Sequence, residues 1–201
     1  MHGPGYWGSR NADTIRLVST THERLSSPFL ESRACCSIIY RLKALDFNQT
    51  TKLYNDSLDY LQGRGVVKNA VRAFELNRTA AEHGLTDAIL AMGWFYANGL
   101  GVSQDVRQAK SWYRKAARKD EPKAMFNLGL IAYRERHWAD ARTWFTRASA
   151  NGHHRSLFWL GKLFWRGHGV SIDKRRARQL FQQAADHKVS EAQRTIRWLR
   201  S

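Results

Sequence analysis

A turn with two glycines occurs three times in this chain of 201 residues, and this repetition limits the possible folds more than any other feature. Each copy has an aromatic residue, then G-x-G-V, and ends in Asn or Asp. The copies are YLQGRGVVKN (60–69), YANGLGVSQD (96–105) and FWRGHGVSID (164–173). Ser57, Gly93 and Gly129 follow one another at intervals of 36 residues, and Gly161 follows after 32, because the third unit lacks the turn. A fixed period of this length predicts stacked structural repeats.

Each unit is expected to be a pair of helices, because apolar and small residues recur at helical spacing on both sides of the turn. Asn69, Asp105 and Asp173 are placed to cap the second helix, since a side-chain oxygen there can accept from free backbone N–H groups. Gly99 and Gly101 allow the positive φ angles of a tight turn. A phosphate-binding loop would need a preceding strand and further glycine or G-K-[ST], which no copy supplies.

Segment 88–117, AILAMGWFYANGLGVSQDVRQAKSWYRKAA, carries the full pattern of small, aromatic and turn residues. This pattern resembles the Sel1-like repeat, a relative of the tetratricopeptide repeat. The resemblance implies an all-α fold, a right-handed α-solenoid of helix-turn-helix units. The first unit departs from the pattern with Ser57 in a glycine slot and Leu76-Asn77 in place of Trp-Tyr. The third unit has Ala132 in the aromatic slot and Tyr133 one residue later.

The predicted organisation has three parts around this array. Residues 1–27 are expected to be a flexible lead-in, 28–50 an N-terminal capping helix opened by Ser27-Pro28, and 191–201 a C-terminal capping helix. The four repeats between them span about 51–86, 87–122, 123–154 and 155–190.

The resemblance implies a non-enzymatic scaffold in which the first helices line a concave groove that grips another protein or peptide. Residues three before and one, four and five after each glycine slot are expected to face this groove. Apart from Ala97, they are Leu90, Trp94, Asn98, Phe126, Leu130, Tyr133, Arg134, Phe158, Lys162, Trp165 and Arg166, with Lys123 and Arg155 as a basic rim. Aromatic residues and arginine anchor many protein interfaces. The alternative is that several of these aromatics pack inside a tightly curled superhelix with no partner.

Charge favours an acidic or amphipathic partner. The net charge is +16, and residues 86–201 carry 22 basic against 9 acidic side chains. Nucleic acid or another polyanion is the second possibility, through the basic segments 112–123 and 173–185. Most of these bases are expected on outer helix faces, where solvated charge is common.

The sequence shows no catalytic, cofactor or metal motif. Histidines fall mostly between helices, and neither HExxH nor a nucleophile motif occurs. Adjacent Cys35 and Cys36 suggest neither a disulfide framework nor a zinc site. The apolar stretches are too short to span a membrane, and the first residues lack the apolar centre of a signal peptide, which favours a cytoplasmic location; an incorrect start or a removed signal stays open.

Overall fold

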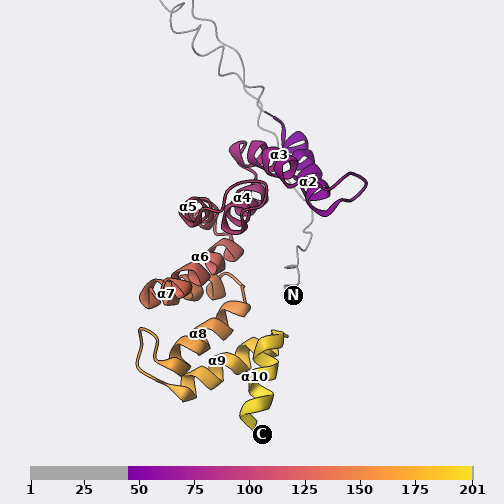
Figure 1. The fold of residues 1–201 in the computed structure, drawn as a ribbon. Coiled ribbons are helices and arrows are strands. Elements are labelled where there is room, and N and C mark those ends of the chain that lie inside the picture. Colours follow the sequence, from indigo (N-terminus) through magenta and orange to yellow (C-terminus); the bar gives the residue numbers. More distant parts are fainter. Residues whose placement is uncertain (1–44, 201) are drawn as a thin grey trace, which may run out of the picture. The chain divides into compact units, whose positions relative to one another are not determined.

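The computed structural model describes residues 45–200, and this part of the chain is helical without any strand (Figure 1). Its helices are α2 (Phe47–Gln62), α3 (Ala70–Glu82), α4 (Thr86–Asn98), α5 (Val106–Ala117), α6 (Pro122–Arg134), α7 (Trp138–Ala150), α8 (Arg155–Arg166), α9 (Lys174–Asp186) and α10 (Ser190–Arg200). The lead-in, both cysteines and most of the capping helix predicted over 28–50 lie outside the described residues. Leu45 and Asp46 precede α2 without helical structure, and α2 begins at Phe47.

Helices adjacent in sequence make the main contacts of this part. The pairs α2·α3, α4·α5, α6·α7 and α8·α9 have the most extensive contacts, and each pair packs on the next through α3·α4, α5·α6, α7·α8 and α9·α10. Figure 1 shows the pairs following one another from α2 to α10. This is the α-solenoid that the repeat pattern predicts.

The glycine slots explain how closely the two helices of a repeat approach. A Cβ built at Gly93 would lie 2.5 Å from the ring of Tyr113, and one at Gly161 would lie 2.5 Å from Phe181. A Cβ built at Gly129 would lie 2.6 Å from the ring of Phe145. An aromatic ring of the second helix therefore rests directly on the backbone of the first helix, as small residues at these slots predict.

The first repeat reaches the same close packing with different side chains. Ser57 occupies the glycine slot, and Asn77 occupies the slot that Tyr113 fills in the next repeat; both are fully buried. Ser57 Oγ donates to the carbonyl oxygen of Ala73 at 2.8 Å, and Asn77 Nδ2 donates to that of Ala88 at 3.0 Å. The two departures from the pattern are thus buried polar side chains, and each donates to a backbone carbonyl oxygen.

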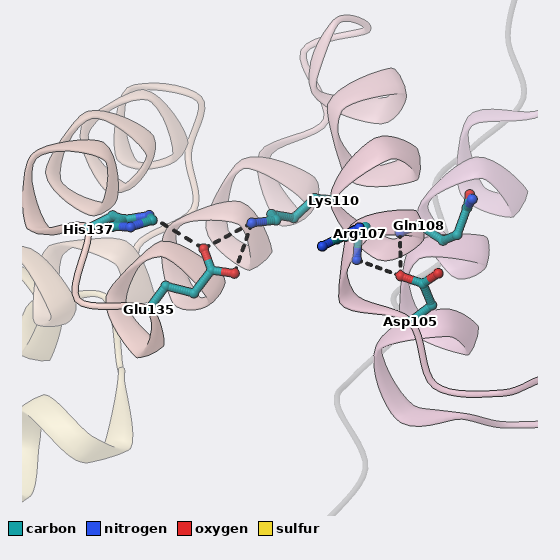
Figure 2. Close-up of polar contacts among 6 residues, drawn as sticks. All are labelled: Asp105, Arg107, Gln108, Lys110, Glu135 and His137. Carbon is teal, nitrogen blue, oxygen red and sulfur yellow. Dashed lines mark hydrogen bonds and ion pairs between the residues drawn. The ribbon is translucent and has the colours of Figure 1, made fainter.

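The predicted caps are confirmed. Asp105 Oδ1 accepts from the backbone N–H groups of Arg107 at 2.7 Å and Gln108 at 3.0 Å (Figure 2). Asn69 and Asp173 cap α3 and α9 in the same manner. These bonds satisfy donors that the first turn of a helix leaves free.

The G-x-G-V turns also join neighbouring repeats. Gly99 and Gly101 have φ angles of 66° and 68°, which confirms the predicted turn. The Cα of Gly101 packs against the backbone at Ala70, at the start of α3. The third repeat lacks this turn, and an ion pair joins it to the second repeat instead, between Lys110 Nζ and Glu135 Oε1 at 2.9 Å (Figure 2).

Candidate functional site

The residues predicted to face a partner lie on α4, α6 and α8, and we call this set the first-helix surface. Its members are Leu90, Trp94, Asn98, Phe126, Leu130, Tyr133, Arg134, Phe158, Lys162, Trp165 and Arg166, with Lys123 and Arg155 at the edge. Trp94, Asn98, Arg134, Arg155 and Arg166 are exposed. Leu130, Tyr133, Phe158, Lys162, Trp165 and Lys123 are half-buried.

Leu90 and Phe126 differ from the rest because they are buried, with exposed fractions of 3% and 7%. Both occupy the slot three residues before a glycine. Phe126 stacks on His153 at a centroid distance of 4.2 Å and lies 5.9 Å from Phe145. These two side chains belong to the hydrophobic core and offer little area to another molecule.

His153 connects the third repeat to the fourth. Its Nδ1 lies 3.0 Å from Ser156 Oγ, and its ring covers Phe126. Burial lowers the pKa of His153 to about 4, and the positive charges of Arg155 and Lys123 act in the same direction. The imidazole is therefore neutral at pH 7.

We expect this histidine to make the protein sensitive to acid. The unfolded imidazole takes up a proton near pH 6.5, while the folded one resists protonation until about pH 4. The stability that the neutral ring supports is present above pH 6.5 and is lost as the pH falls to 4, by about 3 kcal/mol. Urea unfolding of wild type and His153→Gln at several pH values measures this loss. The His153→Gln curve should be flatter.

An equal slope for wild type and His153→Gln between pH 6.5 and 4 contradicts the assignment.

Lys162 lies in the middle of an aromatic cluster on α6 and α8. Its Nζ is 4.0 Å from the ring centroid of Trp159, 5.5 Å from that of Tyr133 and 5.8 Å from that of Phe158. Burial lowers the pKa of Lys162, and Arg166 acts in the same direction. No carboxylate among residues 45–200 forms an ion pair with Lys162. The ammonium is held by ring faces, as in cation–π contacts.

The one-residue shift of the tyrosine in the third repeat explains this cluster. Tyr133 does not take the place of Tyr96, which packs back on Phe74. Its ring instead contacts Trp138 at 5.1 Å and Trp159 at 5.0 Å. Tyr133 Oη, Trp159 Nε1 and His168 Nδ1 are buried without a hydrogen-bond partner in the described part. Trp138, Trp159 and His168 were not among the predicted site residues; the one-residue shift of Tyr133 was the sequence signal that could have indicated them.

Charge on this surface is largely uncompensated. Arg134 and Arg166 form no ion pair with a carboxylate of residues 45–200. Arg155 differs, because it pairs with Glu191 of α10. Trp165 lies 6.2 Å from Phe181, and Lys174 Nζ lies 5.5 Å from the Trp165 ring. The surface therefore combines partly exposed aromatic rings with two arginines, Arg134 and Arg166, that pair with no described carboxylate.

Neither a metal centre nor a membrane span emerges from the described residues. Their His, Cys, Asp and Glu side chains form no group of three or more that could hold an ion. None of their helices has the length and apolar character that crossing a membrane requires.

The repeated helix pairs and their close glycine–aromatic contacts are those of a helical repeat protein. Within this class, the chain belongs to the Sel1 repeat family, which matches residues 53–85, 86–121, 122–137, 139–153 and 154–189. The two short matches fall on α6 and α7 separately, so the five matches cover four helix pairs. Repeats of this family typically mediate protein–protein interaction, and the solenoid is typically a non-catalytic scaffold.

Two relatives illustrate the range of the family. The chitin synthase regulator SKT5 of Saccharomyces cerevisiae is 29% identical over 134 residues, which is 60% of this chain and 19% of that protein. A putative sel1-like repeat-containing protein of Acanthamoeba polyphaga mimivirus is 26% identical over 73 residues, 36% of this chain and 14% of that protein. The chain thus spans about a fifth or less of the length of these relatives.

Solved structures confirm the fold. A Sel1 repeat protein from Oxalobacter formigenes has a TM-score of 0.70 and 27% identity, over 80% of this chain and 66% of that one. A protective antigen of uropathogenic Escherichia coli with an SLR fold has a TM-score of 0.69 and 29% identity, over 79% and 34%. An immunity protein from Pseudomonas aeruginosa shares the fold alone, with a TM-score of 0.54 and 23% identity over 76% and 58%.

Proposed function

We propose that this protein is a scaffold that binds a partner protein or peptide along the first-helix surface. The partner presents an acidic or amphipathic segment. Its apolar side chains cover Trp94 and Trp165, and its carboxylates face Lys162, Arg134 and Arg166.

The observation that carries this proposal is the environment of Lys162. Its ammonium is partly desolvated and lies among aromatic rings, and no described carboxylate neutralises it. A partner carboxylate would gain a charge-assisted hydrogen bond there. Surface charges of one sign also steer an oppositely charged partner during association.

The exposed aromatic residues support the same surface. Trp94 is 36% exposed on α4, and Trp165 is half-buried on α8. Tryptophan is enriched among residues that contribute most to binding, because it buries a large area with few rotamers. The relative named as a regulator is consistent with a role exerted through another protein.

The test replaces both tryptophans. Proteins captured from the native source by wild type but not by Trp94→Ala/Trp165→Ala are identified, purified and titrated against both forms. We expect at least tenfold weaker binding for the double variant, since each truncation at a binding centre typically costs about 2 kcal/mol or more. Lys162→Ala should also weaken binding and reduce its dependence on salt.

Trp112→Ala is the matched control, because Trp112 lies on the second helix α5 under Lys115. Melting temperatures of all forms exclude unfolding as the cause. Equal binding by wild type and the double variant overturns the proposal, as does an equal loss in Trp112→Ala. Retention of oligonucleotide but of no protein favours the nucleic-acid function instead.

A further inference from the structure

A recess with a volume of about 240 Å³ lies on the second helices, on residues that are not part of the first-helix surface. Its lining comes from two repeats: Arg114, Ala117 and Arg118 at the end of α5, and Trp144 and Arg147 of α7. Ala117 is buried, Trp144 is half-buried, and the three arginines are exposed. The recess therefore has an apolar floor and three guanidinium groups around it.

These arginines have no internal counter-ion. Within residues 45–200, no carboxylate forms an ion pair with Arg114, Arg118 or Arg147. The ring of Trp144 lies 4.9 Å from Cζ of Arg147, so this guanidinium group rests against an aromatic face. Three like charges around one recess repel one another, and an anion between them removes that repulsion.

Helix ends alone do not explain the arrangement. A basic residue in the last turn of a helix is favoured by the helix dipole, which accounts for Arg114 on α5 and Arg147 on α7 individually. It does not account for their meeting Arg118 around a common recess formed by two different repeats. An arginine held against an aromatic ring also keeps its donors in a fixed direction.

We propose that this recess binds a phosphomonoester. A phosphomonoester has three terminal oxygens and a charge of about −1.5 to −2 at pH 7, which suits three guanidinium groups. A phosphodiester of a nucleic-acid backbone has a single charge and fewer free oxygens, so it leaves part of the arginine charge uncompensated. The volume is below the range of about 300 to 1,000 Å³ of sites for drug-sized ligands, which suits a phosphate group with a small substituent.

The site lies on helices that do not carry the first-helix surface, so it goes beyond the proposed scaffold function. A partner held on the first helices and a phosphate held on the second helices can be bound at the same time. Failure of one does not imply failure of the other.

The test is a titration with phenyl phosphate at pH 7.5 and constant ionic strength, in which calorimetry measures binding. The indole N–H resonance of Trp144, identified by its absence in Trp144→Phe, reports binding locally. We expect one saturable site on the protein. Dimethyl phosphate, a diester, should bind at least tenfold more weakly. Binding should also weaken from pH 7.5 to 5.5, because the second pKa of a phosphomonoester is about 6 and arginine stays charged.

Variants distinguish binding in the recess from nonspecific attraction to the basic surface. Arg118→Gln/Arg147→Gln should weaken phenyl phosphate binding at least tenfold, and both residues are exposed, so folding is expected to persist. The matched control is Arg142→Gln, an exposed arginine of α7 that does not line the recess. A peptide, acetyl-Gly-phosphoserine-Gly-amide, distinguishes a protein-borne phosphate from a free small molecule; binding of either phosphomonoester supports the site.

The proposal is overturned if neither phosphomonoester shows saturable binding, if the diester binds with equal affinity, or if Arg142→Gln shows an equal loss. Tighter binding of a single-stranded oligonucleotide that displaces phenyl phosphate assigns the basic face to nucleic acid and also overturns it.

Discussion

Replacing Phe145 by alanine is expected to lower the free energy of unfolding by about 3 to 5 kcal/mol. The side chain is completely buried on α7 and lies against the backbone of Gly129 in the paired helix α6. Its ring also packs 5.9 Å from Phe126 and 5.9 Å from Trp159. Removing it leaves a cavity where the third repeat meets the fourth. Urea unfolding followed by circular dichroism measures the loss.

A second phenylalanine provides the control. Phe47 is 74% exposed at the start of α2, so Phe47→Ala should change the unfolding free energy by no more than about 0.5 kcal/mol. Each repeat contacts mainly its neighbours, so Phe145→Ala is expected to broaden the unfolding transition as well. A loss below about 1 kcal/mol for Phe145→Ala means that the glycine–aromatic contact does not hold the helix pair together.

The repeat architecture was predictable because its causes are local in the sequence. A small residue at position 93 and an aromatic residue at 113 recur as a pair, and Asp105 caps the helix that follows its own turn. These relations act within one unit and repeat with it. Even the departures at Ser57 and Asn77 involve slots that the period identifies, although only the structure shows the backbone carbonyl oxygens to which they donate.

The candidate site was less predictable, because its character depends on contacts between units. Spacing from the glycine placed Leu90 and Phe126 on the partner-facing side, whereas the structure shows both buried. Arg155 was predicted to form part of a basic rim, whereas the structure pairs it with Glu191 of the following helix α10. The shift of Tyr133 by one residue turns it towards Trp159 in the following repeat. The repeat period predicts the position of a residue within its own repeat. It does not predict which residues of a neighbouring repeat lie against that residue.

Gly101→Ala is the second substitution with a large expected effect. The φ angle of Gly101 is 68°, which costs an alanine about 1 kcal/mol or more. A Cβ at this position would also lie 2.1 Å from the carbonyl oxygen of Ala70, on backbone at the start of α3. The turn of the second repeat must then move away from the first repeat, as in an overpacked core, at a further cost of about 1 to 3 kcal/mol. Thermal or urea unfolding should show a total loss of about 3 kcal/mol.

Gly65 separates the two causes, because it occupies the same slot in the first repeat. Its φ angle is 70°, but a Cβ there would meet nothing within 4 Å. Gly65→Ala should therefore lose only the conformational part, about 1 kcal/mol. The difference between the two variants measures the contact by which a turn joins one repeat to the previous one. If Gly65→Ala and Gly101→Ala are equally destabilised, the turns do not hold the repeats together, and the stacking depends on the helices alone.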